Sequence, residues 1–259
     1  MNIQRTRIET DQRFGLKANA KAPFPMTDLG ITSLLNSGAT VATQGRVLRR
    51  TQTPGLGKPG AFAVKRAFDV VVSGLLLILL APVFLAVAAA IKLTSKGPVF
   101  FVQRRWGKGN VPFRLYKFRS MHTDLEDRSG IAHTVKNDPR VTAIGRLIRR
   151  SSIDELPQLI NVLKGDMSLV GPRAHVLGMH AAGVRYEDLV PEYFARHAVR
   201  PGITGLAQVR GLRGEVTDAG HAQARVDSDL EYIRTFSVWR DIRILLATIP
   251  AVLTGRAAF

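Results

Sequence analysis

The sequence of 259 residues contains no cysteine, which excludes a disulfide framework, a thiol nucleophile and any zinc or iron–sulfur site with cysteine ligands. Acidic residues are also scarce: 20 Asp and Glu stand against 37 Lys and Arg, so the formal net charge is +17. This surplus predicts an anionic partner, such as a nucleic acid, acidic lipid head groups or a phosphorylated substrate. Aromatic residues make up only 7% of the chain, whereas a nucleic-acid binder usually interleaves aromatic with basic residues.

Residues 1–60 show no sustained apolar period and carry scattered Lys and Arg. The stretch from Pro54 to Gly60 is rich in proline and glycine and cannot propagate a helix. We expect a largely disordered basic tail with one short helix near residues 29–35. A secretory signal is not expected, because no apolar segment follows the first charges.

An uncharged run of 22 residues, Val70–Ile91, follows with basic residues on both flanks. About 20 apolar residues can cross a bilayer core of about 30 Å. Pro82 lies near the middle of the run and should kink or break the helix there. Cations at both ends favour a re-entrant hairpin whose two ends are cytoplasmic. A kinked spanning helix and a buried core helix are the alternatives, and a nucleic-acid binder would leave the run unexplained.

The rest of the chain predicts a mixed α/β domain. Strands are expected at 98–103 and 111–118, with a turn containing Gly107, Gly109 and Asn110 between them. Helices are expected at 141–148, 153–163, 222–236 and 239–253, with Gly165 as a stop for the second. Residues 124–131 predict a charged loop or short helix, and 194–214 an irregular, turn-rich segment. The expected organisation is a tail (1–60), a re-entrant membrane helix hairpin kinked at Pro82 (61–96) and a small mixed helix and strand catalytic domain (97–259).

The stretch Arg149–Leu159 contains the adjacent acids Asp154 and Glu155 beside two arginines. Ser152 and Glu155 fit the S-x-x-E capping box, and Asp154 as the cap would place Pro157 in the donor-free first turn of a helix. Alternatively, one acid can act as a nucleophile and the other as a base or metal ligand, with guanidinium groups neutralising a phosphate. Spacing alone leaves both interpretations open.

Three further motifs present cations at strand ends or rigid turns, where a solvated surface cation is the ordinary interpretation. The sequence contains neither a Walker A motif nor G-x-G-x-x-G, so the common mononucleotide cradles do not explain them. The motifs are Lys117-Phe118-Arg119-Ser120-Met121, Gly171-Pro172-Arg173 and Arg200-Pro201-Gly202-Ile203-Thr204-Gly205.

From about Lys65 to Gly255 the chain resembles the bacterial sugar transferase family, the monotopic polyprenyl-phosphate glycosyl-1-phosphate transferases. The resemblance rests on many short motifs in the same order. They include the three above, Lys65-Arg66-x-Phe68-Asp69, the run with its central Pro82, Gly97-Pro98-Val99-Phe100-Phe101, Asp154-Glu155-Leu156-Pro157-Gln158, Asn161-Val162-Leu163-Lys164-Gly165-Asp166-Met167-Ser168 and Asp229-Leu230-Glu231-Tyr232-Ile233.

The resemblance implies roles for particular residues. Asp154 is expected to be the nucleophile and Glu155 its partner, with Mg²⁺ bridging this pair and the substrate pyrophosphate. The residues expected to bind phosphate or nucleotide are Lys117, Arg119, Arg149, Arg173, Arg200 and Asp229. Two departures from the family pattern are Ala81, where serine often precedes the kink proline, and Ala174-His175, where the usual pair is Pro-Glu.

The implied activity is transfer of a hexose-1-phosphate from a UDP-sugar to undecaprenyl phosphate through a covalent aspartyl phospho-sugar, with release of UMP. This step begins exopolysaccharide assembly at the cytoplasmic face of the bacterial inner membrane, on anionic lipid. The identity of the hexose, the pathway and a homodimer stay open, and no nucleic-acid partner is expected. A non-catalytic scaffold would leave the acid pair without a purpose, and an ordinary glycosyltransferase would release UDP.

Overall fold

The computed structural model describes residues 59–125, 138–214, 216 and 218–253. The basic tail expected at 1–60 therefore lies outside the described residues except for its last two positions. The short helix expected near residues 29–35 and most of the charged segment 124–131 also lie outside them.

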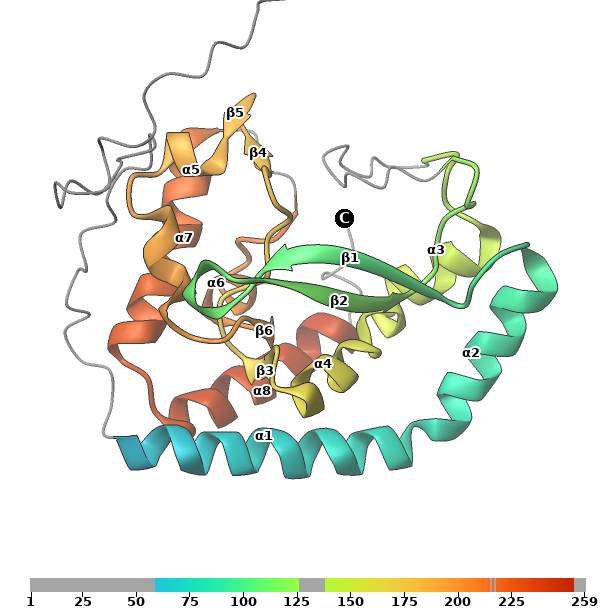
Figure 1. Cartoon of the computed structure of the whole chain (residues 1–259), viewed down its shortest axis with the longest axis horizontal. Coiled ribbons are helices and arrows are strands. Elements are labelled where there is room, and N and C mark those ends of the chain that lie inside the picture. The colour runs from blue at the N-terminus through green and yellow to red at the C-terminus, as the bar shows by residue number, and fades with distance from the viewer. Residues whose placement is uncertain (1–58, 126–137, 215, 217, 254–259) are drawn as a thin grey trace, which may run out of the picture. The chain divides into compact units, whose positions relative to one another are not determined.

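The apolar run forms two helices, α1 (Pro59–Leu79) and α2 (Ala81–Thr94), which meet at 60° (Figure 1). Pro82 is the second residue of α2, where a missing N–H costs no hydrogen bond. In one continuous helix its ring would clash with the carbonyl of Ile78, so the chain breaks at Leu80. No single helix in the described part of the chain is long and apolar enough to cross a membrane; α1 and α2 together meet that test of length and composition.

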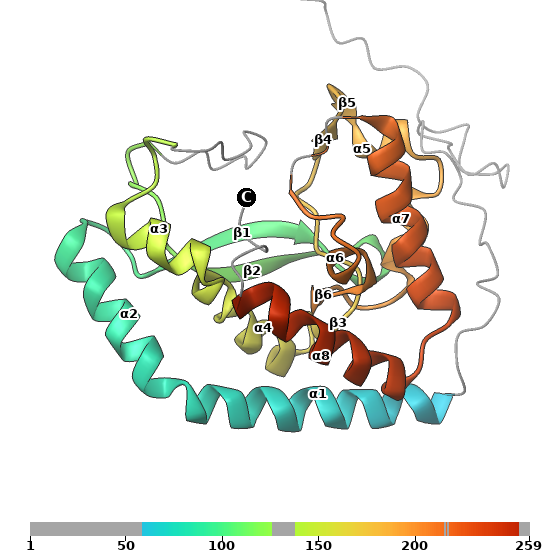
Figure 2. The same ribbon diagram turned by 180° about the vertical axis from the view of Figure 1, so that it is seen from behind.

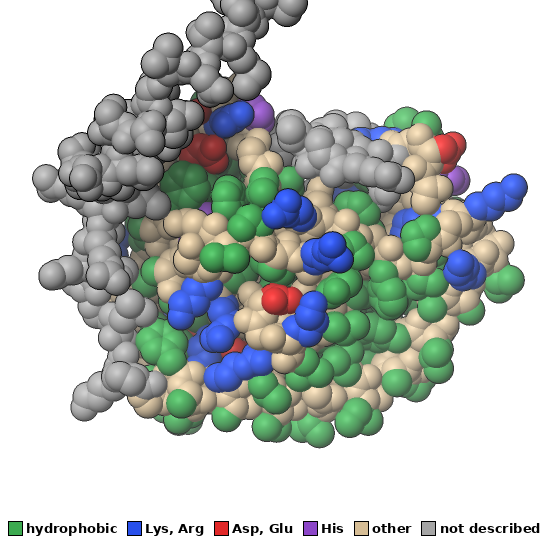
Figure 3. Space-filling view, in the orientation of Figure 1, with side chains coloured by type: hydrophobic (Ala, Val, Ile, Leu, Met, Phe, Trp, Pro, Cys, Tyr) green, Lys and Arg blue, Asp and Glu red, His purple; other side chains and the backbone are tan. Residues whose placement is uncertain are grey.

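Helix α1 places buried polar side chains among the apolar ones that pack on the domain, and it leaves large apolar side chains exposed on its other side. Asp69 and Ser73 are 2% and 0% exposed, whereas Leu75 and Ile78 are 63% and 76% exposed. Figure 3 shows the resulting band of hydrophobic side chains along the edge of the domain formed by α1 and α2. A helix on the surface of a water-soluble domain usually has a polar outer face, so the apolar outer face of α1 is unusual.

The predicted hairpin is confirmed as the antiparallel pair β1 (Phe100–Trp106) and β2 (Pro112–Phe118), in which Phe100 pairs with Phe118. Its connection is the 3₁₀ turn η1 (Lys108–Asn110), where Gly109 and Asn110 have φ of 67° and 62°. Glycine adopts this left-handed conformation freely and asparagine tolerates it, so both residues suit the turn.

The remaining elements confirm a mixed helix and strand domain. The expected helix at 153–163 divides into the 3₁₀ turn η2 and α4, because Pro157 precedes the first residue of α4 and donates no hydrogen bond. Short elements occupy the segment 194–214, which was predicted to be irregular. The elements are α3 (Ala143–Arg150), η2 (Ile153–Glu155), α4 (Gln158–Lys164), β3 (Ser168–Val170), β4 (His180–Ala181), β5 (Val184–Arg185), α5 (Tyr186–Leu189), η3 (Tyr193–Ala198), β6 (Gly202–Thr204), α6 (Leu206–Val209), α7 (Ala219–Arg234) and α8 (Val238–Leu253).

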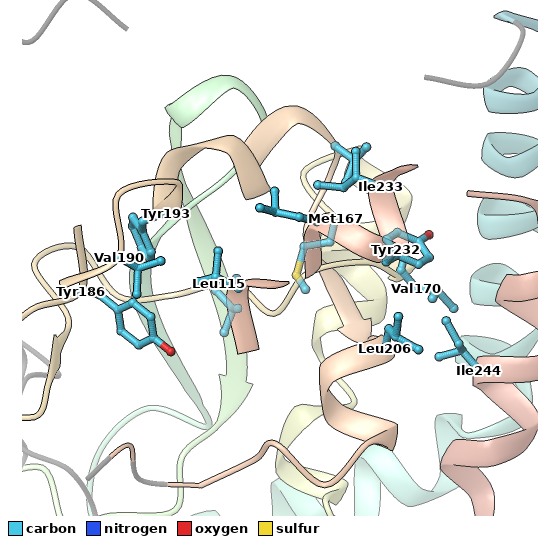
Figure 4. Packing of buried hydrophobic residues seen from close by; sticks show 14 of the residues in the cluster. Leu115, Met167, Val170, Tyr186, Val190, Tyr193, Leu206, Tyr232, Ile233 and Ile244 are labelled. Atoms are coloured by element: carbon cyan, nitrogen blue, oxygen red, sulfur yellow. Dashed lines mark hydrogen bonds between the residues drawn. The ribbon is translucent and has the colours of Figure 1, made fainter. Parts of the chain in front are cut away.

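Helix α1 lies along one side of this domain and packs against α4, β3 and α8 (Figures 1 and 2). Strands β3 and β6 pair in parallel, and β4 and β5 form a separate short antiparallel pair. The hydrophobic core joins β2, β3, α7 and α8, and in Figure 4 Tyr186 and Tyr193 lie on the Leu115 side of this core. Helix α1 packs on this core, whereas α2 packs through Val87 and Ile91 in a second, smaller cluster with Phe118 and Ile148.

Polar contacts fix the first turns of α1 to the domain. Lys65 donates to Asp241 of α8 at 2.5 Å and to Asp69 at 3.4 Å, and Asp69 also accepts from the backbone N–H of Leu169. Arg66 donates to the last carbonyls of α4, those of Val162 and Leu163, at 2.6 and 2.9 Å. The motif Lys65-Arg66-x-Phe68-Asp69 is therefore the joint between the apolar helix and the domain.

Two buried histidines of the core make stability depend on pH. Burial lowers the pKa of His197 to about 3, with help from the nearby Arg196, and burial holds the pKa of His175 well below its ordinary value. In the unfolded chain a histidine has a pKa of about 6.5. Between that value and the folded pKa the unfolded state binds more protons, so the free energy of unfolding falls as pH falls.

We therefore expect His197→Gln to reduce the loss of stability between pH 7 and pH 5, measured by urea unfolding of the full chain in detergent. The exposed His122 provides the control, because His122→Gln should leave the pH dependence as in wild type. A wild-type stability that is constant over this range would contradict the prediction.

Candidate active site

The acid pair lies in η2, a single turn between α3 and α4. Ser152 precedes it with φ of 56°, a left-handed conformation, and none of the described residues makes a side-chain capping hydrogen bond there. Helix α4 begins after Pro157 and not at Asp154. The capping-box interpretation is therefore wrong, and the two carboxylates are free of a helix-starting role. Asp154 is nevertheless buried, with 8% of its surface exposed.

Two cations hold Glu155. Lys117, near the end of β2, donates to Oε1 of Glu155 at 2.9 Å. Arg173, in the turn after β3, donates to Oε1 at 2.5 Å and to Oε2 at 3.2 Å. Lys117 also lies 3.9 Å from Oδ2 of Asp154. The sequence motifs that carry Lys117, Asp154-Glu155 and Arg173 therefore meet at one site.

The two acids differ in electrostatic environment. Burial raises the pKa of Asp154, Lys117 lowers it in part, and the neighbouring Glu155 raises it further. Burial alone would also raise the pKa of Glu155, but Arg173 and Lys117 outweigh burial and hold that pKa well below its ordinary value. Glu155 is thus the firmly ionised member, and Asp154 the more basic one.

Arg149 joins this group from the last turn of α3. Its Nη1 lies 3.5 Å from the hydroxyl of Ser120, and its charge interacts with Asp154 and Glu155. Burial lowers the pKa of Arg149, and the attraction of Asp154 opposes that shift. A guanidinium already removed from part of its water gains most when a phosphate binds it.

Two other predicted phosphate ligands have their contacts elsewhere. Arg119 is buried and donates to the carbonyls of Ser95 and Lys96 after α2. Arg200 donates through Nε to the carbonyl of Gly165 at 2.8 Å, at the opposite end of α4 from the acid pair. Arg119 fixes the end of the bent helix pair, and Arg200 caps α4.

The Arg200–Gly205 motif has a backbone role as well. Gly202 pairs with Ser168 across β3 and β6, and its N–H donates to the carbonyl of Pro172 at 2.9 Å. A Cβ on Gly202 would lie 2.1 Å from the backbone nitrogen of Gly171, so only glycine permits this approach. The contact supports the turn that presents Arg173.

Asp229 of α7 acts on the site through another residue. It accepts from Arg196 at 2.6 and 2.9 Å, and both side chains are almost fully buried. Arg196 in turn donates to the backbone carbonyl of Arg173 at 2.8 Å. Sequence reasoning missed Arg196. Arg196 could have been sought as the partner of Asp229, because an acid buried on α7 requires a buried cation nearby.

A magnesium ion fits the donor atoms at this site. The described residues hold no group of three or more metal-ligating side chains, and Asp154 and Glu155 are the adjacent carboxylates available. Mg²⁺ in enzymes is usually held by one or two carboxylates together with water and substrate phosphates, so two are enough.

A carboxylate pair with Lys117, Arg149 and Arg173 beside it therefore lies at one site on a mixed helix and strand domain. The chain belongs to the bacterial sugar transferase family, whose model matches residues 60–255. This family is the one that the sequence motifs resemble.

Three curated relatives show how the match is distributed. The exopolysaccharide production protein PSS of Rhizobium leguminosarum bv. phaseoli is 57% identical over 196 residues, covering 76% of this chain and 98% of the relative. The undecaprenyl-phosphate glucose phosphotransferase of Komagataeibacter xylinus is 54% identical, covering 75% of this chain but 37% of the relative. The UDP-glucose:undecaprenyl-phosphate glucose-1-phosphate transferase of Caulobacter vibrioides is 50% identical, covering 75% of this chain and 72% of the relative.

Asp229→Asn should destabilise the protein strongly, because it leaves the charge of Arg196 buried without a counter-ion. Breaking a buried ion pair in this way costs about 3–5 kcal/mol. On the same helix, Glu231 pairs with Arg210 and Arg240 in a partly exposed position, so Glu231→Gln should cost less than about 1 kcal/mol. Denaturant unfolding of both variants tests this, and equal losses of stability would contradict it.

Proposed function

We propose that this protein transfers a hexose-1-phosphate from a UDP-sugar to undecaprenyl phosphate and so begins the assembly of an exopolysaccharide. The observation that carries the proposal is the pairing of Glu155 with Lys117 and Arg173 directly beside the buried Asp154. The names of the Komagataeibacter and Caulobacter relatives specify this type of reaction with glucose, which makes UDP-glucose the first donor to test.

Asp154 acts as the nucleophile in this proposal. Its carboxylate oxygen forms a bond to the sugar-bearing phosphorus, and the bond from that phosphorus to the oxygen of UMP breaks. The phosphate oxygen of undecaprenyl phosphate then attacks the same phosphorus, and the bond to Asp154 breaks. Two displacements allow a soluble and a membrane-bound substrate to use one site in turn, and ping-pong kinetics follow.

The environments of the two acids support this assignment. Both oxygens of Glu155 already accept hydrogen bonds from cations, which hold that carboxylate in place and reduce its nucleophilicity. Asp154 keeps the more basic carboxylate, because burial raises its pKa. An oxyanion with a higher pKa attacks phosphorus better, provided that it is ionised.

Charge neutralisation permits a carboxylate to attack a pyrophosphate. Mg²⁺ held by Asp154 and Glu155 would supply part of it by screening the phosphate oxygens. Lys117, Arg149 and Arg173 supply the rest by binding phosphate oxygens with charge-assisted hydrogen bonds. Lys117 and Arg173 are held by Glu155 before the donor arrives, so little reorganisation is needed when it binds.

The bent pair α1–α2 serves as a re-entrant membrane element in this proposal. Its outward face is apolar, and the face toward the domain carries Lys65, Asp69 and Ser73, as an apolar environment outside the protein requires. Trp239 on α8 is 74% exposed and, with Arg240 and Arg243, suits the interface.

This arrangement would place residues 61–96 in the cytoplasmic leaflet of the inner membrane. The catalytic domain, 97–259, would then lie at the depth of the lipid phosphates, next to anionic lipid. Figure 3 shows basic side chains gathered on the face beside the apolar edge, where acidic head groups would meet them.

Asp154→Asn tests the nucleophile. Incubation with sugar-labelled UDP-glucose alone should leave label on the wild-type protein after denaturation, and none on Asp154→Asn, since an amide cannot form the acyl phosphate. The same change at the exposed Asp227, Asp227→Asn, should label like wild type. Release of UMP is expected, whereas release of UDP would indicate an ordinary glycosyltransferase. Normal turnover by Asp154→Asn would overturn the assignment and make Glu155 the next candidate.

The topology is tested with cysteines, because the chain has none of its own. Gly60→Cys and Lys96→Cys, on either side of the bent pair, should both resist a membrane-impermeant thiol reagent in intact cells and react after permeabilisation. Labelling of only one in intact cells would establish a spanning helix. Pro82→Leu removes the cause of the break and should shift the protein toward that spanning form.

A further inference from the structure

The site contains more positive charge than its own carboxylates compensate. Arg105 of β1, Arg213 of the loop after α6 and Arg225 of α7 all interact electrostatically with Arg173. Sequence analysis singled out none of these three. Arg105 and Arg213 also interact with Glu155, which already pairs with Lys117 and Arg173. Arg225 is attracted by Asp229, but the hydrogen bonds of Asp229 go to Arg196.

Hydrogen bonds to backbone carbonyls fix two of these arginines. Arg105 donates through Nη1 to the carbonyl of Ala174, next to Arg173, at 3.2 Å and through Nη2 to the side chain of Gln103. Arg225 donates through Nη2 to the carbonyl of Gly214 at 3.1 Å and so holds the loop that carries Arg213. Three separate elements therefore converge beside Arg173.

Each of the three arginines keeps a buried donor without a partner. Among the described residues no acceptor bonds the Nε of Arg105, Arg213 or Arg225. Burial lowers the pKa of all three, that of Arg105 to about 10, and the repulsion of Arg173 adds to the effect. A buried cationic donor without an acceptor is costly, so the folded protein is prepared for an anion that supplies several oxygens.

We propose that Arg105, Arg213 and Arg225 form a second phosphate subsite beside Arg173, one that holds the phosphate of the nucleotide in the donor. This inference rests on the proposed function. The first subsite, at Lys117 and Arg149, takes the phosphate that carries the sugar. Cleavage of the bond between the two phosphates leaves negative charge on UMP, which the three guanidinium groups stabilise as it develops.

The position of the subsite favours the nucleotide over the acceptor lipid as the source of this phosphate. Arg225 lies on α7, and Arg213 on the loop that leads to it. Helix α2, part of the proposed membrane element, lies at the opposite end of the domain from α7 (Figures 1 and 2). A lipid phosphate that enters near the bend between α1 and α2 would therefore approach from the end of the domain opposite to α7.

Arg213→Gln is the sharpest test, because Arg213 lies on a surface loop and bonds no described carboxylate. The matched control is Arg210→Gln, three residues away, since Arg210 is already paired with Glu231. Binding of UDP and of UMP to the full-length chain in detergent is measured by calorimetry. Arg213→Gln should weaken both about 10-fold or more, as expected for loss of hydrogen bonds to a charged group. Arg210→Gln should stay within about 2-fold of wild type.

Two further measurements complete the test. The KM values show whether the phosphate belongs to the nucleotide or to the acceptor lipid, and the unfolding midpoint shows whether the variant has lost binding or stability. The KM for UDP-glucose should rise in Arg213→Gln, while the KM for undecaprenyl phosphate stays unchanged. The reverse pattern would overturn the assignment to the nucleotide. The unfolding midpoint of the free variant should equal or exceed that of wild type, because a desolvated, unpaired donor has been removed, and Arg225→Gln should repeat the loss of UDP affinity.

The outcomes distinguish this inference from the proposed function. If wild type binds UDP and transfers sugar phosphate but Arg213→Gln and Arg225→Gln do the same with unchanged constants, only the subsite is wrong. If wild type itself binds neither UDP nor UMP, the proposed reaction fails and the subsite fails with it.

Discussion

Two neighbouring carboxylates cannot both be buried and ionised unless cations stand beside them, and this constraint organises the domain. Glu155 is ionised because Lys117 and Arg173 each reach it within hydrogen-bond distance. Those cations come from the end of β2 and from the turn after β3, so the hairpin and the short parallel pair β3–β6 must meet at η2. Each of them is supported in turn by residues that touch no carboxylate of the pair.

Hydrogen bonds from neighbouring elements hold the backbone of the turn that carries Arg173. Its backbone carbonyl is held by Arg196, the next carbonyl by Arg105, and the one after by the N–H of Trp106. Three consecutive carbonyls that accept hydrogen bonds leave this turn little freedom. The ion pair of Arg196 with Asp229 contributes to the site through this backbone and through its charges, which act on Arg225.

The sequence allowed the elements to be predicted more fully than the contacts between them. Pro82 in a long apolar run requires a break, the spacing of Gly107 and Asn110 indicates a hairpin turn, and periodic apolar residues mark α7 and α8. The acid pair was identified by motif order. The capping interpretation failed because Ser152 adopts φ of 56°, a left-handed conformation that the sequence of this stretch does not indicate.

Long-range contacts explain the remaining differences at the site. Arg119 lies two residues after Lys117 and would share its face if the strand continued, but β2 ends at Phe118, and Arg119 turns instead to the carbonyls after α2. Arg105 and Arg196 lie in segments whose spacing shows no special feature. Their importance depends on what the fold places next to them, which a single sequence does not reveal.

The whole chain and the site both carry a surplus of positive charge, but the physical consequences of the two surpluses differ. A net charge of +17 spread over a surface costs little, because water and salt screen it. The buried guanidinium of Arg225 forms no ion pair with a described carboxylate and is attracted by Asp229 only from a distance, so its charge is screened far less. Such charge lowers the stability of the free protein and is relieved only by an anion in the site. If the proposed function holds, binding of the phosphorylated donor would therefore also stabilise the domain, because its phosphates would neutralise these cations.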